Sequence, residues 1–392
     1  MQLHERTLDV SAPPHMLFGV DAVKSLPEHV RGLGKSAVLL VTDPGLVRAG
    51  VAAQIEAILE GASIRVVRFD AVDPNPSTDN IKAGSAAYHA SGLSDAAVVS
   101  LGGGSAMDAA KGIALHITNP VEDVVDLDYR ADLKNPALPI IAIPTTAGTG
   151  AETNTFGVIT NPATHRKFYV GNASAQAKLM LLDPRLTVAL PPAPTAATGM
   201  DVFSHAIESL VSRNANPYAD GINLEVIRTV GQWLPIAYRE PSNLEARSQM
   251  LLASSIVGQA FRTTGLGMAH AIGHSLGGQL NLPHGLALAL VMAAVMRYNM
   301  ADATVMSKYA RAAFALGVGN TAQSEEENAN AAVAKVEQLT AAVGITQRLR
   351  DVGVTDERLE PLVIDSIEDV VLYNNPIQPS VDDMRAIITQ LL

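Results

Sequence analysis

Two clusters of histidine and carboxylate side chains have the spacing of a single helix face. Asp201 and His205 are four residues apart in GMDVFSHAIESLV, and His270 and His274 are four apart in GMAHAIGHSLGG. Residues at i and i+4 of a helix lie on the same side, so each pair can reach one ion. His284 follows 14 residues after His270. Three imidazoles and one carboxylate together predict a site for a divalent metal.

Glu208 continues the first helix face at i+7 from Asp201, where its carboxylate could accept a hydrogen bond from a ligand histidine. The rest of this helix is apolar, so its polar groups need compensation that a cation supplies. The alternative explanation is a set of ordinary core histidines with one loop histidine. It is the better explanation for any single histidine, but the poorer one for a cluster of four groups. The chain has no cysteine. Fe²⁺ and Zn²⁺ both suit nitrogen and oxygen ligands, and spacing does not choose between them.

A glycine-rich turn predicts a second kind of site. The apolar run Asp95–Leu101 leads directly into Gly102, Gly103, Gly104 and Ser105, and a helical pattern follows. Glycines let backbone amides approach a ligand, and the free N–H groups of a helix start favour an anion such as a phosphate. The alternative is a tight turn with an ordinary helix cap, for which Ser105 and Asp108 are suitably spaced. The G-x-G-x-x-G dinucleotide fingerprint is not matched.

Two further polar turns end apolar runs in the same half of the chain. Asp43 follows Ser36–Thr42, where its carboxylate could accept hydrogen bonds from a ribose diol and would repel a 2′-phosphate, which favours NAD over NADP. A turn-forming aspartate before Pro44 and Gly45 explains it equally well. Three hydroxyls follow Leu138–Ile143, on Thr145, Thr146 and Thr149. They suit a sugar or phosphate at the carboxyl edge of a sheet, and a plain loop is the alternative.

The pattern of the whole chain predicts which elements carry these residues. Strands are expected at Ser36–Thr42, Ser63–Phe69, Asp95–Leu101 and Leu138–Ile143, and helices at Val51–Leu59 and Ile81–Ala90. Such alternation predicts a parallel sheet covered on both faces. From about Pro191, helical periodicity runs almost unbroken to Leu392. We therefore expect an α/β domain over residues 1–190 and an all-helical domain over residues 191–392, with the proline-rich start of the second marking the boundary.

Composition limits the partners of the chain. Its net charge of −11 disfavours nucleic acid and anionic membranes, both of which attract basic patches. The longest apolar run, Gly285–Met296, is shorter than the roughly 20 residues that span a bilayer, so a buried core helix is expected there. The absence of cysteine fits a reducing cytoplasm. We therefore expect no nucleic-acid partner and no membrane partner, whereas composition says nothing about a small-molecule substrate.

Four stretches together resemble the iron-containing (group III) alcohol dehydrogenase family. They are GGGSAMDAAKG from residue 102, PTTAGTGAE from 144, LPPAPTAATGMDVFSHAIES from 190 and GMAHAIGHSLGGQLNLPHG from 267. The resemblance implies a dehydroquinate synthase-like fold, in which a dinucleotide-binding α/β domain precedes a helical metal-binding domain and the cofactor lies in the cleft between them. It also implies a homodimer.

The resemblance carries roles to individual residues. It implies metal ligands at Asp201, His205, His270 and His284, and a further histidine near the nicotinamide at His274. Phe261 is similar to a residue that lines the substrate pocket. The chain reads Thr153–Asn154 where many relatives read Val-Thr, so Asn154 and Phe156 are expected to shape the preference for substrate, toward a more polar one than ethanol. The implied contacts to NAD are Asp43, Asn75, Gly102, Gly103, Gly104, Ser105, Thr145, Thr146, Thr149 and Lys167.

The expected activity is transfer of hydride between a small primary alcohol, or its aldehyde, and NAD(H). Fe²⁺, with Zn²⁺ as the other candidate, would polarise the reacting oxygen, and His274 would relay the proton because imidazole exchanges protons near neutral pH. Three alternatives remain. They are a metal-independent reductase similar to maleylacetate reductase, a lyase similar to dehydroquinate synthase, and a non-catalytic nucleotide-binding protein with a structural metal.

Overall fold

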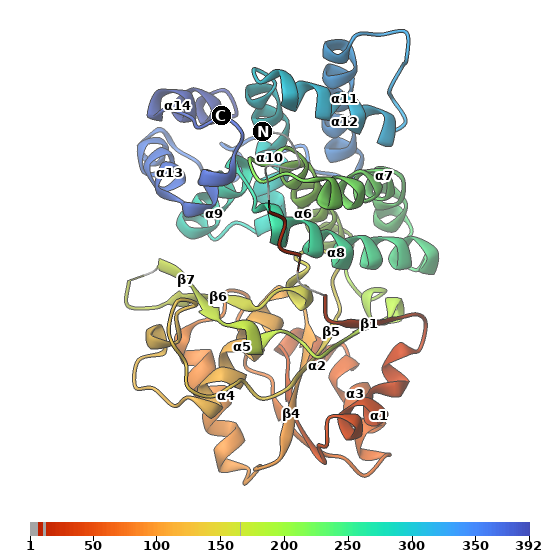
Figure 1. The fold of residues 1–392 in the computed structure, drawn as a ribbon, viewed down its shortest axis with the longest axis vertical. Coiled ribbons are helices and arrows are strands. Elements are labelled where there is room, and N and C mark those ends of the chain that lie inside the picture. Colours follow the sequence, from red (N-terminus) through yellow and green to blue (C-terminus); the bar gives the residue numbers. More distant parts are fainter. Residues whose placement is uncertain (1–6, 11–12, 165) are drawn as a thin grey trace.

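The computed structural model of the protein describes residues 7–10, 13–164 and 166–392, and Figure 1 shows an α/β half below a helical half. The strands are β1 (His15–Phe18), β2 (Ala37–Val41), β3 (Arg65–Phe69), β4 (Ala96–Gly102), β5 (Ile140–Pro144), β6 (Phe156–Asn161), β7 (Arg166–Gly171) and β8 (Leu179–Leu182). The helices of the α/β half are α1 (Leu26–Gly32), α2 (Pro44–Arg48), α3 (Val51–Glu60), α4 (Thr78–Ala90) and α5 (Gly104–Thr118), with short 3₁₀ helices at η2 (Ala22–Ser25), η3 (Val124–Leu127), η4 (Ala151–Thr153), η5 (Ala173–Ala175) and η6 (Pro184–Thr187).

Six strands form one sheet in the order β1-β8-β5-β4-β2-β3, and every neighbouring pair is parallel. The predicted parallel sheet is therefore confirmed. Strands β5, β4 and β2 are adjacent, so their carboxyl ends lie side by side at one edge. This edge is where open parallel sheets bind ligands.

Both faces of the sheet are buried, which explains why its central strands are apolar throughout. Leu39 and Val41 of β2 pack into a cluster with residues of α4 and α5. The alternate residues Val38 and Leu40 pack into a second cluster with residues of α1 and α3. The alternation of side chains along a strand thus divides one apolar run between two cores.

The four predicted strands correspond to β2, β3, β4 and β5, and the two predicted helices to α3 and α4. Sequence patterns did not predict β1, β8 or the antiparallel hairpin of β6 and β7. The hairpin strands, FGVITN and RKFYVG, mix polar and apolar residues without strict alternation.

The predicted cap by Ser105 and Asp108 is wrong. Gly103 is the N-cap of α5 without a side-chain bond, and the Ser105 hydroxyl donates instead to the carbonyl oxygen of Pro74 at 2.5 Å.

The chain is helical from Pro192 to its end, apart from short connections. The helices are α6 (Pro192–Val211), α7 (Pro217–Arg239), α8 (Leu244–Thr264), α9 (Met268–Leu280), α10 (His284–Asn299), α11 (Ala303–Ala315), α12 (Glu325–Ala342), α13 (Asp356–Glu368), η7 (Val370–Asn374) and α14 (Val381–Thr389). They surround one large apolar core, and α10 is buried in it as its apolar run predicts. Among the described residues, no helix combines the length and apolarity that a bilayer crossing requires.

Candidate metal and cofactor site

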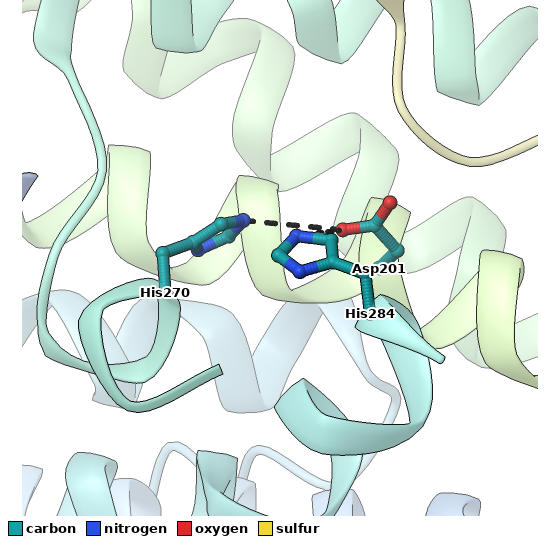
Figure 2. Close-up of side chains that lie close together, drawn as sticks. All are labelled: Asp201, His270 and His284. Atoms are coloured by element: carbon teal, nitrogen blue, oxygen red, sulfur yellow. Dashed lines mark ion pairs between the residues drawn. The ribbon is translucent and has the colours of Figure 1, made fainter. Parts of the chain in front are cut away.

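The carboxylate of Asp201 lies at the meeting point of three histidine rings. Its Oδ1 atom is 3.5 Å from Nε2 of His205, 3.9 Å from Nε2 of His270 and 3.7 Å from Nε2 of His284. Figure 2 shows the His270 and His284 rings turned toward this carboxylate. One donor atom each from Asp201, His270 and His284 lie within 4.8 Å of one another, a grouping that could hold a metal ion.

These donor atoms fit a cation because the protein leaves them without partners. Asp201 Oδ1 and His270 Nε2 are buried and make no hydrogen bond to the described protein. Burial raises the pKa of Asp201 to about 8. It also lowers the pKa of His205 well below its usual value, with a further contribution from the charges of His270 and His274. A buried carboxylate facing neutral imidazoles is unfavourable by itself, and a divalent ion would compensate it. Oxygen and imidazole donors without sulfur suit Fe²⁺ or Zn²⁺.

Three helices bring these donors together. Asp201 and His205 are one turn apart on α6, His270 lies in the first turn of α9, and His284 is the first residue of α10. Close packing of α10 on α6 depends on Gly285, because a Cβ atom there would lie 1.9 Å from the carbonyl oxygen of Ala197. Glycine at this position therefore lets His284 approach Asp201.

Glu208 connects two of the three helices. It is buried on α6, and its carboxylate accepts hydrogen bonds from the backbone N–H groups of Gly267 at 3.0 Å and Ala269 at 2.6 Å. Nδ1 of His270 lies 2.5 Å from Oε2 of the same carboxylate. An ionised carboxylate only accepts, so Nδ1 is the donor and Nε2 carries the lone pair that faces Asp201. The structure thus contains the hydrogen bond that the spacing led us to expect between Glu208 and one of the candidate ligand histidines.

Phe261 lies directly against the donor cluster. Its ring stacks on His205 with centroids 4.5 Å apart and 29° between planes, and His205 stacks in turn on His270 at 4.8 Å. Phe261 is half-buried on α8. An aromatic wall beside a metal site can shape the space for a substrate.

His274 is hydrogen-bonded to Asp369, a residue near the C-terminus that lies 95 positions later in the sequence. Its Nδ1 atom lies 2.7 Å from Oδ2 of Asp369, and its ring stacks on His284 with centroids 5.4 Å apart. Burial by itself would raise the pKa of Asp369, but the bonds from His274 and from the backbone N–H of Val371 bring it below its usual value. The side chain of His274 is 30% exposed, so the ring borders the cluster and also contacts solvent.

Polar turns meet at the carboxyl edge of the sheet. Asp43 follows β2, the three glycines end β4 and begin α5, and the threonines follow β5. Cβ atoms on Gly103 and Gly104 would lie 3.0 Å from Thr146 Oγ1 and 2.8 Å from Thr149 Cγ2. Only glycine therefore allows the two turns to pack together. Gly102 has φ near +153°, and a Cβ there would lie 3.6 Å from Asp43 Oδ2.

Asp43 has the turn-forming role that one of its two sequence-based explanations predicts, and its contact with a ribose stays a prediction. Oδ1 accepts from the backbone N–H groups of Gly45 at 2.7 Å and Leu46 at 3.1 Å, so Asp43 caps α2. Oδ2 points instead toward the glycine turn at the end of β4. The same carboxylate can therefore cap a helix with one oxygen and present the other to a ligand.

The threonine turn connects the sheet edge to the metal cluster. A Cβ on Gly148 would lie 2.9 Å from the Thr198 side chain on α6, one turn before Asp201. A Cβ on Gly150 would lie 2.9 Å from the carbonyl oxygen of Ser254 on α8. The turn is thus packed between the sheet and the helical half, with the candidate cofactor residues on one side and the candidate ligands on the other.

Asn75 and Lys167 lie at the surface between the two halves. The Lys167 ammonium donates to Asn75 Oδ1 at 3.3 Å, and Asn75 Nδ2 donates to Asn281 Oδ1 at 3.0 Å. Asn281 ends α9 in the left-handed conformation, with φ near 53°. The side chain of Lys167 contacts solvent, but neighbouring protein atoms partly desolvate its ammonium and lower its pKa, while the nearby carboxylate of Asp108 opposes this shift. The two predicted residues are therefore in contact, and Asn281 joins them to the helical half.

The two residues expected to set substrate preference are engaged within the α/β half. Asn154 is buried, and its Oδ1 accepts from the Lys111 ammonium and from the backbone N–H of Phe156. The ring of Phe156 packs edge-on against Tyr129 at 6.0 Å and Tyr169 at 5.1 Å. Their roles in a substrate pocket remain predictions.

Three polar residues near the site carried no sequence signal strong enough to be singled out: Lys111, Asn281 and Asp369. Lys111 follows the glycine turn by seven residues and reads as an ordinary helix lysine. Asn281 and Asp369 belong to short connections whose partners lie far away in the sequence. A polar residue next to a predicted ligand helix, as Asn281 is, was the only available hint.

Comparisons with known proteins identify relatives over almost the whole chain. The chain matches the model "Iron-containing alcohol dehydrogenase" over residues 13–184 and the model "Fe-containing alcohol dehydrogenase family, C-terminal" over residues 195–392. It is 36% identical to alcohol dehydrogenase 4 of Schizosaccharomyces pombe over 97% of this chain and 89% of that protein.

Solved structures have the same fold. A 1,3-propanediol oxidoreductase superposes with a TM-score of 0.94 at 35% identity, over 99% of this chain and all of that one. A sulfoacetaldehyde reductase from Bifidobacterium kashiwanohense, solved in complex with NAD⁺, superposes with a TM-score of 0.88 at 30% identity, over 98% of this chain and 99% of the other. The α/β sheet followed by a helical half is thus the architecture of these oxidoreductases. The chain belongs to the iron-containing alcohol dehydrogenase family.

Proposed function

We propose that this chain is an iron-dependent, NAD(H)-linked alcohol dehydrogenase that interconverts a small primary alcohol and its aldehyde. The observation that carries the proposal is the buried Asp201 oxygen, which faces the Nε2 atoms of three histidines and has no hydrogen-bond partner among the described residues. A carboxyl group in this environment must either keep its proton or face a cation, and a metal ion held by the three histidines would supply that cation. Family membership supports the oxidoreductase activity.

The metal would be held by Asp201, His205, His270 and His284, with Fe²⁺ as the ion and Zn²⁺ as the other candidate. When bound, such an ion supplies Lewis-acid polarisation of an alcohol or carbonyl oxygen. The chain's own residues position it. Glu208 fixes the tautomer of His270, and Phe261 covers the His205 ring, which limits the space in which a small substrate can lie.

NAD would lie along the carboxyl edge of the sheet. The backbone amides of the glycine turn and the start of α5 suit a pyrophosphate, and the Asp43 oxygen that is free of the helix cap suits a ribose diol. Lys167 adds a positive charge nearby. The full set of proposed contacts is Asp43, Asn75, Gly102, Gly103, Gly104, Ser105, Thr145, Thr146, Thr149 and Lys167.

His274 would exchange the proton of the reacting oxygen with solvent. It is the histidine of this group that lies outside the proposed ligand set, although its ring stacks on His284 and its Nδ1 is hydrogen-bonded to the Asp369 carboxylate. Its Nε2 atom is therefore available to a substrate or water. Phe261 would line the substrate pocket, together with Asn154 and Phe156.

Three broader features also belong to this proposal. The two domains would be residues 1–190 and 191–392, with the boundary at the prolines where α6 begins. The protein would act as a homodimer, because β1 pairs only with β8 in the described sheet and leaves an open edge flanked by the exposed side chains of Phe18 and Val20. The absence of cysteine supports a cytoplasmic enzyme, and the net charge of −11 supports one that binds neither nucleic acid nor anionic membranes.

The test combines metal analysis with turnover on one sample. We would purify the protein without chelator or added metal, measure iron and zinc per chain, and follow NADH oxidation with aldehydes of two to four carbons. We expect about one iron per chain, activity lost to a chelator, and recovery with Fe²⁺. A protein that contains neither iron nor zinc and gains no NADH oxidation from either ion would contradict the proposal.

A further inference from the structure

We propose that the segment Asp369–Asn375, which we call the C-terminal clasp, is the positioning element for helix α9 and so for His270 and His274. The proposal rests on the proposed function, because it assigns the clasp a role in metal binding and turnover. The clasp consists of η7 and one residue on each side of it. Two of its residues make side-chain hydrogen bonds to α9 in the described structure, Asp369 and Asn375.

Asn375 caps the first turn of α9 from a distance of more than 100 residues in the sequence. Its side-chain oxygen accepts from the backbone N–H of Met268 at 3.1 Å, two residues before His270. Its amide nitrogen donates to the carbonyl oxygen of Ile377 at 2.7 Å. These two partners fix the orientation of the amide, because a backbone N–H only donates and a carbonyl only accepts.

The same amide also connects α9 to α10. Asn375 exchanges two hydrogen bonds with Asn299, at 2.8 and 3.2 Å, and Asn299 is the last residue of the helix that begins with His284. Both asparagines are only 1% exposed. The approach to α9 is close, since a Cβ on Gly267 would lie 2.7 Å from Asn375 Oδ1. A buried amide with all its groups satisfied is a specific link, because moving it would leave several polar groups without partners.

Glu208 and Asn375 together complete the start of α9. The first N–H groups of a helix have no partners within it, and here Glu208 accepts from Gly267 and Ala269 while Asn375 accepts from Met268. The cap is thus divided between α6, which carries Asp201, and the clasp. Loss of the clasp's share would let the first turn of α9 loosen at the position that holds His270.

Asp369 positions the second histidine of α9. Its Oδ2 lies 2.7 Å from His274 Nδ1, and its Oδ1 accepts from the backbone N–H of Val371 at 2.9 Å, which anchors the carboxylate to η7. The ring of His274 is also stacked on His284 with 19° between the planes. Hydrogen bond and stacking together leave the ring one orientation, with Nε2 directed away from Asp369.

The clasp is itself fixed to the third ligand helix. The carbonyl oxygen of Asn374 accepts from the backbone N–H of Arg213, two residues after α6 ends, at 2.9 Å. Leu372, at the centre of η7, is buried in the helical core. The clasp therefore touches the ends of α6, α9 and α10, which are the three helices that carry the proposed ligands. It sets their mutual positions from outside the site.

The experiment uses the full chain and separates the two contacts. Asp369→Ala removes the acceptor for His274, and Asp369→Asn restores an oxygen that can accept from Nδ1. Asp365→Ala is the matched control, because Asp365 also accepts from a side chain of α9, that of Gln279 at 2.5 Å, but at the exposed far end of the helix. Asn375→Ala removes the cap of Met268. Each protein is loaded with Fe²⁺ for turnover and with Zn²⁺ for metal affinity, measured by competition with a chromophoric chelator.

We expect Asp369→Ala to lower kcat at least tenfold while the dissociation constant for Zn²⁺ stays within about threefold, and we expect Asp369→Asn to recover part of kcat. We expect Asn375→Ala to weaken Zn²⁺ binding at least tenfold and to speed hydrogen exchange of the amides at the start of α9. The Asp365→Ala protein should match the wild type in all three measurements.

Wild-type kcat in Asp369→Ala, or an equal loss in Asp365→Ala, would overturn the proposal. So would unchanged hydrogen exchange and Zn²⁺ affinity in a folded Asn375→Ala protein. If Asn375→Ala does not fold, the comparison of Asp369→Ala with Asp369→Asn decides whether the clasp positions α9. A wild-type protein that reduces no aldehyde would contradict the proposed function, whereas the clasp would still be judged by Zn²⁺ affinity and hydrogen exchange.

Discussion

The Nε2 atom of His270 lies 3.9 Å from Oδ1 of Asp201, and neither atom has a hydrogen-bond partner among the described residues. Both atoms carry lone pairs, and because they are buried and unpaired, a cation that both can ligate is the group that fits between them. Burial of the Asp201 carboxylate costs free energy in the metal-free protein and is compensated only when the ion is present. Removing this carboxylate should therefore leave the metal-free protein at least as stable, but should make the metal-loaded protein less stable.

We accordingly expect Asp201→Asn to unfold at a temperature no lower than the wild type when both are metal-free. Addition of Fe²⁺ at 100 times the dissociation constant should stabilise the wild type by about 2.7 kcal/mol and the variant hardly at all. Differential scanning fluorimetry and metal analysis on the same samples provide the measurement. His89→Ala, which removes an exposed histidine of α4, is the control. This variant should bind the metal as the wild type does and should be stabilised by Fe²⁺ to the same extent. Full metal content in Asp201→Asn would rule out the ligand assignment.

Glu208→Gln should weaken metal binding by about 10- to 100-fold. The carboxylate accepts from three donors, the backbone N–H groups of Gly267 and Ala269 and the His270 ring. An amide of the same shape offers one acceptor and turns an N–H group toward a donor, so either the first turn of α9 or the His270 ring loses its partner.

Chelator competition measures the affinity of this variant for the metal. Glu245→Gln is the matched control, since Glu245 is an exposed carboxylate on α8 that accepts only from Gln249 in the described structure. An affinity for Glu208→Gln equal to that of this control would show that Glu208 does not orient a ligand.

Asp43→Asn should relax the preference for NADH over NADPH. Asparagine is as good an N-cap as aspartate, so the start of α2 should be preserved while the negative charge near a 2′-phosphate is removed. We expect the ratio of kcat/KM for NADPH to that for NADH to rise on the order of tenfold, or about 1.4 kcal/mol. Steady-state kinetics with both cofactors measures it. Asp95→Asn, at the opposite end of β4, should leave the ratio unchanged, and an unchanged ratio in Asp43→Asn would remove Asp43 from the ribose site.

Asp108 should give the protein a pH dependence of stability in mildly acidic solution. Burial raises its pKa to about 6 from 3.8, although the Lys111 ammonium, 4.0 Å away, opposes this shift. The native state then holds the proton more tightly than the unfolded chain does. The free energy of unfolding should therefore fall as pH rises from about 4 to about 6, by up to about 3 kcal/mol.

The measurement is urea unfolding of metal-free protein across this pH range. Asp108→Asn should remove this part of the slope and be more stable than the wild type above about pH 6. Exposed Asp132, mutated to asparagine, should leave the slope as it is. If the free energy of unfolding of Asp108→Asn changes with pH as steeply as that of the wild type, the Asp108 carboxyl of the wild type has an ordinary pKa in the folded protein.

Much of the site was predictable from the sequence because the decisive geometry is local. An α-helix places residues four apart on one side, so the pairing of Asp201 with His205 and the position of Glu208 on the same helix face follow from spacing alone. The same holds for strands β2, β4 and β5, whose apolar runs end in polar turns, and for the helical second half. Hydrogen bonds and side-chain periodicity within a few residues determine all of these features.

The tertiary structure decided what those local elements do together. The order β5-β4-β2 brings Thr146, Gly103 and Asp43 to one edge, although 60 or more residues separate Asp43 from the others in the sequence. The hairpin of β6 and β7, the bond between His274 and Asp369, and the cap that Asn375 places on α9 carry no local signal. They depend on packing between segments far apart along the chain, where the folded core, not the neighbouring residues, determines which polar groups meet.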